Sequence, residues 1–259
     1  MMQAAEKLGQ DTLLDEIEIY WSKRADSYSQ EVRYEMAHEN EQNWMSVLTE
    51  YLKNAPGKKI LDIGTGPGFF AIGLAKRGYQ MTAVDYTPNM LSEARKNAKD
   101  LEDQITFLRM DAQHLNFPDT CFDGIVTRNL TWNLEQPEQA YREWHRVLKK
   151  GGIMLNFDAG WYNYLFDDRK AQEFSNDRRN VKDAKIKDFE AYSESAKMEE
   201  ISRKLILSRC QRPNADVEML YQAGFRKVFT DLQIGDRVLD EVEKINYGSR
   251  KMFMLCAIK

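Results

Sequence analysis

The chain has 259 residues, of which 42% are hydrophobic and five are tryptophan, enough to bury the core of one α/β domain with an insertion. Its net charge is −4 with acidic and basic residues interspersed, which argues against general nucleic-acid binding, because such binding needs a clustered basic face. The three cysteines show no disulfide or metal-ligand spacing, so we expect no metal site. Residues 1–20 are too acidic for a signal peptide, and no apolar run reaches the roughly 20 residues that span a bilayer. We therefore expect a cytoplasmic protein without a membrane span.

The N-terminal region, residues 11–53, is predicted to be helical. Apolar residues recur there at helical spacing, namely Trp44, Val47, Leu48, Tyr51 and Leu52. The run 54–57, which contains a proline and a glycine, ends this pattern. We expect residues 1–54 to form a helical cap beside the rest of the chain.

From residue 59 strands and helices alternate, which is typical of a mostly parallel sheet covered on both faces. The predicted strands are 59–63, 80–84, 105–109, 124–127 and 153–157. The predicted helices are 69–77, 88–99 and 137–147, the first of them stopped by Gly78. Residues 55–160 are therefore expected to form an α/β core.

The strand signal stops between Trp161 and Arg209, where charges of both signs are dense. Aromatic residues recur in this stretch, namely Trp161, Tyr162, Tyr164, Phe166, Phe174, Phe189 and Tyr192. We predict two or three helices here, forming a lid insertion over 161–209. The α/β pattern resumes over 210–259, with a helix at 216–223 and strands at 225–232 and 251–258 that complete the core sheet.

A glycine-rich turn follows the first predicted strand. Gly64, Gly66 and Gly68 have no Cβ, so the backbone there can approach a ligand closely. Asp85 ends the next strand about 20 residues on, where a nucleotide-binding βαβ unit carries its ribose-binding acid. The run 66–71 also fits the pattern G-x-G-x-x-A, so an NAD(P)-dependent oxidoreductase is an alternative, as is a tight turn with no ligand.

Polar residues at the ends of three strands add to this signal. Asp62 precedes the glycine turn by two residues, Asp111 and Ala112 follow the third strand, and Asn129 follows the fourth. Ligands of open α/β sheets bind at this carboxyl edge.

Together these segments resemble the class I S-adenosylmethionine-dependent methyltransferases, in particular the small-molecule, methyltransferase domain 11 or ubiquinone-biosynthesis-like branch. The matching runs are 61–68, 84–90, 111–112, 122–123 and 148–152, and residues 21–28 resemble the entry segment of such enzymes. The resemblance implies a doubly wound, seven-stranded, mostly parallel sheet whose last strand is antiparallel, which suits the short link between the final two predicted strands. It implies S-adenosylmethionine as cofactor, S-adenosylhomocysteine as product and a small-molecule acceptor. We expect a monomer or homodimer.

The residues that the resemblance implies for cofactor binding come from the N-terminal segment, the glycine turn and the strand ends: Tyr28, Asp62, Gly64, Thr65, Gly66, Gly68, Asp85, Tyr86, Met90, Asp111, Ala112 and Asn129. Asp85 would accept both ribose hydroxyls, because an ionised carboxylate can take two donors. Asp62 would lie near the amino-acid end or cap the loop. Asp111 would accept from the adenine amino group or cap a helix, and Met90 would flank the adenine or fill the core.

The acceptor side is less specific. In-line methyl transfer needs alignment and exclusion of water, and a general base is optional. Acid–base candidates near the expected opening are His114, Asp158, Tyr162 and Arg128, and candidate substrate contacts are Trp21, Trp132, Trp161 and Tyr162. Residues 128–131 contain neither Asn/Asp-Pro-Pro-Tyr nor Pro-Cys, which disfavours amino-methylation of bases or glutamine and cytosine C5 chemistry. A non-catalytic module that binds S-adenosylmethionine is a further alternative.

Overall fold

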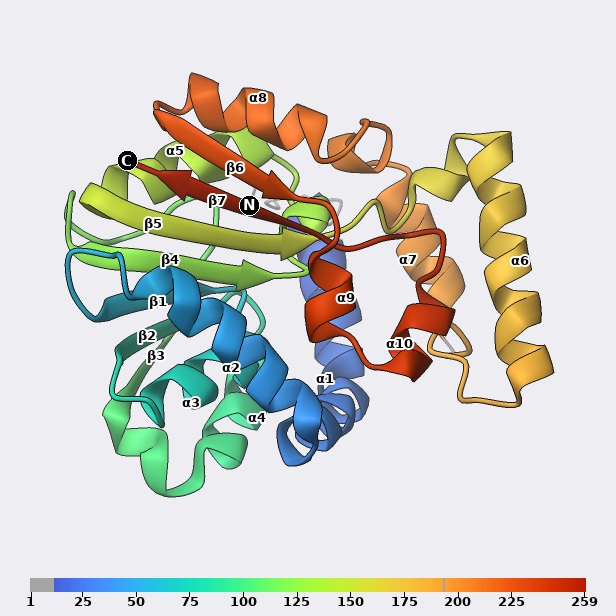
Figure 1. Ribbon diagram of the computed structural model, residues 1–259, viewed down its shortest axis with the longest axis horizontal. Helices are drawn as coiled ribbons and strands as arrows, with labels where there is room; N and C mark the ends of the chain where they lie inside the picture. The colour runs from blue at the N-terminus through green and yellow to red at the C-terminus, as the bar shows by residue number, and fades with distance from the viewer. Residues whose placement is uncertain (1–11, 193) are drawn as a thin grey trace, which may run out of the picture.

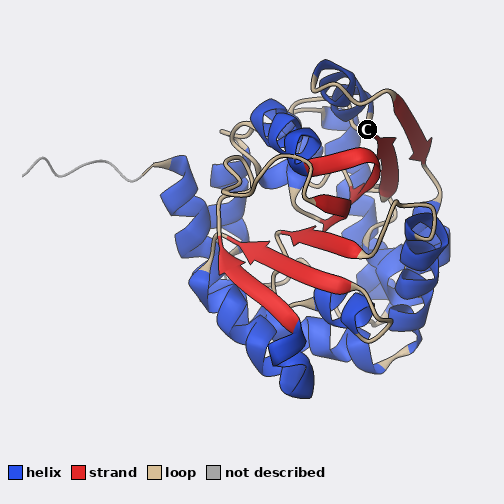
Figure 2. Cartoon of the chain, turned by 90° about the vertical axis from the view of Figure 1, so that its left-hand side faces the viewer, coloured by secondary structure: helices blue, strands red, loops and turns tan. Residues whose placement is uncertain are grey.

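The computed structural model describes residues 12–192 and 194–259. Its centre is a seven-stranded sheet in the order β3-β2-β1-β4-β5-β7-β6 (Figure 1 and Figure 2). The strands are β1 Lys59–Ile63, β2 Gln80–Asp85, β3 Ile105–Arg109, β4 Phe122–Arg128, β5 Leu148–Asp158, β6 Lys227–Asp231 and β7 Phe253–Ile258. Adjacent strands pair in parallel from β3 to β5, and β7 runs antiparallel to both β5 and β6. The predicted fold class, including the reversed last strand, is confirmed.

The two central strands, β1 and β4, are buried almost throughout. Their sequences are nearly continuous apolar runs because helices cover both faces of the sheet. The parallel register pairs Ile60 with Gly124 and Asp62 with Val126. The glycine turn after β1 and the residues after β4 therefore meet at one edge of the sheet.

Helices cover the sheet in two layers (Figure 1). One face carries α2 Glu39–Leu52, α3 Phe69–Ala75, α4 Pro88–Ala98 and α9 Ile234–Val238, and the other carries α5 Pro137–Val147 and α8 Asn214–Gln222. On the first face the ring of Trp44 lies 5.1 Å from that of Phe157. On the second, Tyr141 and Trp144 are fully buried, each side chain contributing roughly 1.5–3 kcal/mol.

Further helices gather beyond the carboxyl ends of the strands: α1 Leu13–Ala37, α6 Asp168–Ala184, α7 Ser195–Ser202 and α10 Glu241–Asn246 (Figure 1). The predicted helical run 11–53 is two helices, because the backbone of His38 is extended (φ −120°, ψ 178°). The prediction of two or three helices within 161–209 is confirmed by α6 and α7. The link between β6 and β7 holds α9 and α10, although its sequence predicts no clear helix.

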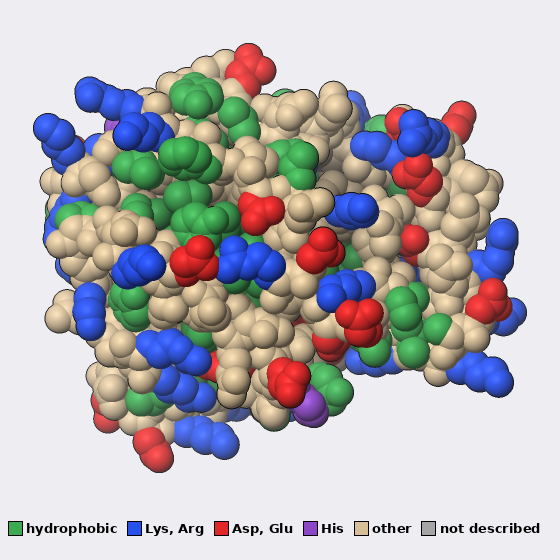
Figure 3. Space-filling view, viewed as in Figure 1, with side chains coloured by type: hydrophobic (Ala, Val, Ile, Leu, Met, Phe, Trp, Pro, Cys, Tyr) green, Lys and Arg blue, Asp and Glu red, His purple; other side chains and the backbone are tan. Residues whose placement is uncertain are grey.

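The surface of the molecule shows acidic and basic side chains intermixed on the face drawn in Figure 3. Within residues 12–192 and 194–259, no helix combines the length and the apolar character needed to cross a bilayer.

Candidate functional site

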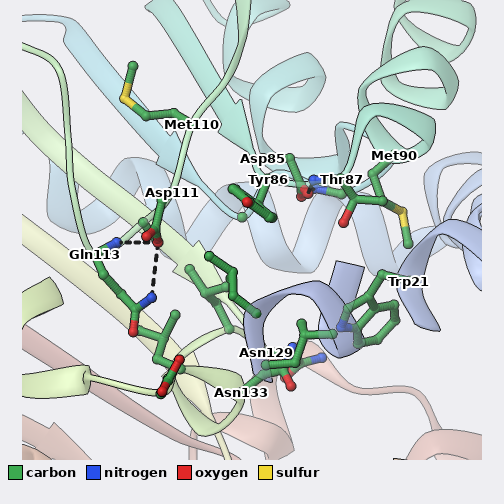
Figure 4. A pocket seen from close by; sticks show the side chains of 18 of the residues that line it. Trp21, Asp85, Tyr86, Thr87, Met90, Met110, Asp111, Gln113, Asn129 and Asn133 are labelled. Carbon is green, nitrogen blue, oxygen red and sulfur yellow. Dashed lines mark hydrogen bonds between the residues drawn. The ribbon is translucent and has the colours of Figure 1, made fainter. Parts of the chain in front are cut away.

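A cavity, here called the first cavity, lies at the carboxyl edge of the sheet beneath α1 (Figure 4). Nine predicted cofactor residues line it: Tyr28, Gly64, Gly66, Asp85, Tyr86, Met90, Asp111, Ala112 and Asn129. Trp21, a predicted substrate contact, lines it as well. In Figure 4, Asp85, Tyr86 and Met90 stand on one side, Asp111 and Gln113 on another, and Trp21 approaches from α1.

The glycine turn has the backbone that its sequence predicts. Gly64 and Gly66 have φ of +67° and +52°, in the left-handed region that favours glycine. A Cβ on Gly64 would lie 2.8 Å from the Leu130 side chain, closer than atoms can pack. A Cβ on Gly66 would point toward the Tyr28 ring, 3.6 Å away. The turn therefore leaves room for a ligand between β1 and α1.

Asp85 connects the glycine turn to the segment that precedes α4. One carboxylate oxygen, Oδ2, accepts from the N–H of Gly66 at 2.9 Å, and the other, Oδ1, accepts from the N–H of Thr87 at 2.9 Å. Burial raises the pKa of this carboxyl, and these two N–H groups oppose the rise. Each carboxylate oxygen can accept a second donor, so both can still receive ribose hydroxyls.

Asp62 lies behind the turn and does not line the first cavity. It is 2% exposed, and its Oδ2 accepts from the Thr65 hydroxyl at 2.6 Å and the Ala71 N–H at 3.0 Å. Burial raises its pKa to about 7. These contacts fit the interpretation that Asp62 caps the loop. Because the Thr65 hydroxyl is turned toward Asp62, Thr65 does not line the first cavity either.

Asp111 caps a turn, because no helix follows it in the structure; the alternative of a helix N-cap is wrong. Its Oδ1 accepts from the N–H and the side-chain amide of Gln113, at 2.9 and 3.1 Å (Figure 4). His114, a predicted acid–base candidate, lies beside it on the surface, with Nδ1 3.1 Å from Asp111 Oδ2.

The wall opposite the turn comes from α1 and α4. The Trp21 and Tyr28 rings are 5.6 Å apart. Met90 is 2% exposed yet lines the cavity, so it belongs to both the core and the wall. Arg109 lies 5.0 Å from the Tyr86 ring and pairs with Glu18 of α1 at 3.0 Å, which ties this helix to the end of β3.

Asp158 is placed where it cannot meet a substrate. It is fully buried, and Arg212 Nη1 lies 3.1 Å from its Oδ2. Its oxygens also accept from the Thr131 hydroxyl, the N–H of Trp132 and the indole of Trp161. The prediction that Asp158 is an acid–base candidate is therefore wrong, because the fold uses both of its oxygens.

The predicted aromatic substrate contacts pack mainly among themselves. The Trp132 ring lies 5.0 Å from that of Tyr162, tilted by 35°, and its indole N–H donates to the Asn129 carbonyl at 2.9 Å. Trp161 packs edge-on against Tyr247 at 5.0 Å. Neither Trp132 nor Trp161 nor Tyr162 lines the first cavity. Burial raises the pKa of Tyr162 well above its usual value, so its hydroxyl is a poor base.

A larger cavity of about 650 Å³, here called the second cavity, adjoins the first. The two share Tyr28, Arg128 and Asn129 as lining residues. Arg128 pairs with Glu35 at 2.7 Å and lies 4.4 Å from the Phe69 ring. The second cavity falls within the size range of small-molecule sites.

Sequence reasoning missed most of the second cavity. Its walls come from α1, α2, the segment before α7 and the link that carries α10, and the residues it missed include Glu31, Glu35, Asn40, Trp44, Phe189, Asp240, Glu243 and Tyr247. In the first cavity it missed Leu14, Ile17, Thr87, Met110, Gln113, Leu130, Asn133, Leu134 and Glu135. Thr87 lies within the recognised run 84–90, and Met110 and Gln113 flank the 111–112 motif; most of the others carry no local signal.

Within the described ranges, no group of three or more His, Cys, Asp or Glu side chains is placed to hold a metal ion.

Comparison with known proteins gives a consistent family. Residues 61–156 match the family described as "Methyltransferase domain". A demethylmenaquinone methyltransferase of Thermus thermophilus is 38% identical over 41% of this chain and 50% of its own length. A phosphatidylethanolamine N-methyltransferase of Cereibacter sphaeroides is 35% identical over 39% of this chain and 51% of its own. The chain thus spans about half the length of these curated relatives.

A solved structure shares the fold across nearly the whole chain. The methyltransferase bound to the Haloferax volcanii Trm112 activator superposes with a TM-score of 0.60 at 18% identity, covering 92% of this chain and 96% of its own. Three observations point to the same family: the strand order, the position of the glycine turn and Asp85 at one edge of the sheet, and the matched family model. Residues 61–156 therefore carry the methyltransferase domain of the class I S-adenosylmethionine-dependent enzymes.

Proposed function

We propose that this protein transfers a methyl group from S-adenosylmethionine to a small-molecule acceptor by in-line displacement. One observation carries the proposal: the first cavity, with the glycine turn and Asp85, adjoins the second cavity at Tyr28, Arg128 and Asn129, which line both. A donor and an acceptor held in adjoining cavities can be aligned across this junction.

The residues of the first cavity fit the parts of the cofactor. The space beside Gly66 admits the amino-acid end, Asp85 accepts the ribose hydroxyls, and Tyr86 and Met90 flank the adenine beside Asp111 and Ala112. The cofactor, when bound, supplies a methyl group already activated by the sulfonium charge. The protein's remaining task is to align the acceptor and exclude water.

We further propose that the N-terminal cap, residues 1–54, and the insertion, residues 161–209, together form a lid over the carboxyl edge of the sheet. The core beneath it is formed by residues 55–160 and completed by residues 210–259. The first cavity measures about 100 Å³, less than small-molecule sites usually hold. We infer that α1 moves outward to admit the cofactor. The three cysteines are free, which supports a reducing compartment such as the cytoplasm.

Calorimetric titration with S-adenosylmethionine tests the donor assignment, and detection of S-adenosylhomocysteine with a metabolite pool tests turnover. We expect saturable binding and product release only when an acceptor is present. Binding of NADH in place of S-adenosylmethionine would overturn the proposal in favour of an oxidoreductase. Binding without turnover on any pool would favour a non-catalytic module.

A further inference from the structure

The second cavity carries more acidic than basic side chains. Its walls hold four carboxylates and two cations: Glu31, Glu35, Asp240, Glu243, Arg128 and Lys187. When all are ionised their formal charges sum to −2. The excess sits in a partly enclosed space, where charges interact more strongly than in water.

Both cations are already paired. Arg128 Nη1 lies 2.7 Å from Glu35, and Lys187 Nζ lies 3.5 Å from Glu31 at the exposed mouth. In the part of the chain that the structure describes, neither Asp240 nor Glu243 forms an ion pair. The unbalanced charge therefore belongs to these two residues of the α10 region.

Glu243 is the more buried of the two, at 8% exposure. Its Oε2 accepts from the Asn40 amide and the Asp240 N–H, each at 2.9 Å, within a capping box. Its Oε1 accepts from no described residue. Burial, and then the charge of Glu35, raise its pKa to about 7. Such a carboxylate gains most from a cationic ligand, because burial without a counter-charge is costly.

Aromatic rings form much of the remaining wall: Tyr28, Tyr34, Trp44, Phe189 and Tyr247. The faces of such rings attract ammonium groups. The rings of Phe189 and Tyr247 lie 5.9 Å apart, and Tyr247 lies near enough to Glu243 for the carboxylate charge to raise the pKa of its phenol. Carboxylates and ring faces are thus combined in one cavity.

At the junction with the first cavity, Asn129 offers an unused acceptor. Its Oδ1 is buried and has no hydrogen-bond partner among the described residues. Asn129 follows the end of β4 with a φ of +55°, a conformation that costs energy for a residue with a side chain. An N–H group placed between the cavities would satisfy this oxygen.

We propose that the second cavity binds an alkylamine and that the amine nitrogen, at the junction formed by Tyr28, Arg128 and Asn129, is the methyl acceptor. This assignment of the substrate class rests on the methyltransferase function proposed above. A neutral acceptor such as a hydroquinone would leave Asp240 and Glu243 without a counter-charge.

The bound ammonium gives one proton, through the solvent of the second cavity, to Glu243, and the freed lone pair forms a bond to the methyl carbon. The sulfur–methyl bond breaks and its electron pair stays on sulfur, so the sulfonium becomes a neutral thioether. The positive charge passes to the methylated nitrogen, and Glu243 releases its proton to water.

Calorimetry with a matched pair of probes tests the charge requirement. Phenethylamine and phenethyl alcohol differ at one group, and near pH 8 the amine is protonated while Glu243 is ionised. The titrations are run on the full chain, alone and saturated with S-adenosylhomocysteine. We expect the amine to bind at least about tenfold tighter than the alcohol, the effect of one charge-assisted contact. Equal affinities, or no amine binding, would overturn the proposal.

The variant Glu243→Gln should remove most of this preference, since glutamine keeps the capping box but not the charge. Glu241→Gln, at an exposed position of the same helix, is the matched control and should leave the preference unchanged. The comparison of the two probes on the wild type stands even if a variant misfolds.

Turnover distinguishes failure of this assignment from failure of the proposed function. With S-adenosylmethionine present, methylation of phenethylamine supports the assignment. Methylation of 1,4-naphthohydroquinone alone would refute the amine acceptor while upholding the methyltransferase. Amine binding with no methylation of any probe would refute nitrogen as the acceptor atom. Absence of S-adenosylmethionine binding would refute the proposed function itself.

Discussion

The two cavities are built in different ways. The first takes most of its polar residues from the ends of β1, β2, β3 and β4, which are close in sequence to recognisable motifs. The second is assembled from α1, α2, the segment before α7 and the β6–β7 link, over more than 200 residues of chain. The proposed donor site can therefore be recognised from short motifs, whereas the proposed acceptor site depends on how distant helices pack.

The two cavities also differ in how readily their residues can be replaced. Parallel strands and left-handed glycines hold the first cavity rigidly, since few residues can replace them. The second cavity takes most of its lining from helices and loops outside the sheet, although Trp44 also packs on Phe157 of β5. The names of the two relatives give different acceptors, demethylmenaquinone and phosphatidylethanolamine.

The largest expected effect is a loss of stability on substitution of Asp158. This substitution tests whether an acid at the end of a strand necessarily belongs to the site. Asp158→Asn should lower the free energy of unfolding by about 3–5 kcal/mol, because it breaks a buried ion pair with Arg212. Urea unfolding measures this. Asp183→Asn, on the exposed face of α6, is the control. Wild-type stability with a large fall in turnover would instead make Asp158 catalytic.

The next largest effect is expected at Glu243 in the second cavity, where the free energy of unfolding should depend on pH. Its folded pKa of about 7 exceeds the usual 4.5, so the folded state binds the proton more tightly. The stabilisation is fully present below pH 4.5 and lost as pH rises through 7, a cost of about 3 kcal/mol at 1.36 kcal/mol per pKa unit.

Urea unfolding of wild type and Glu243→Gln at pH 4.5 and 8 measures this cost. The variant should gain on the wild type as pH rises. The charged or titratable groups that face Glu243 are Glu35, Asp240, Arg128 and Tyr247, and all are retained in both proteins. An equal pH dependence in the two proteins would show that Glu243 is not the titrating group.

Asp85 tests the independence of the two cavities. Asp85→Ala should weaken S-adenosylmethionine binding by about 10–100-fold, since charge-assisted hydrogen bonds contribute about 1.5–3 kcal/mol each. Glu243→Gln should change this affinity less than about threefold, because it lies outside the first cavity. Calorimetry measures both, with Asp100→Ala on the surface as control. A similar loss in both variants would mean that the cavities are one coupled site.

The smallest effect is expected at His114, whose ring is largely exposed beside Asp111. His114→Ala should change turnover less than about twofold and stability by less than about 0.5 kcal/mol. Steady-state assays and urea unfolding check this, with His38→Ala at another exposed position as the reference. A tenfold fall in turnover would restore His114 as an acid–base group.

Local sequence predicted much of the fold because the sheet obeys local rules. The apolar runs, the left-handed glycines and the acid at the end of β2 each have a short-range cause. Asp158 shows where such rules fail. Its place at the carboxyl end of β5 suits a site residue, but Arg212, Thr131 and Trp161 contact its oxygens from other segments.

The amino-acid sequence by itself predicted the proposed donor side of this protein, because the glycine turn, Asp85 and Asp111 lie at the ends of consecutive strands that a parallel sheet must bring to one edge. Only the tertiary structure decided the proposed acceptor side. Glu35, Trp44, Glu243 and Tyr247 carry no shared motif, and they meet because α1, α2 and α10 pack over that edge. Their carboxylates and ring faces attract a cation strongly only when burial removes water from around them.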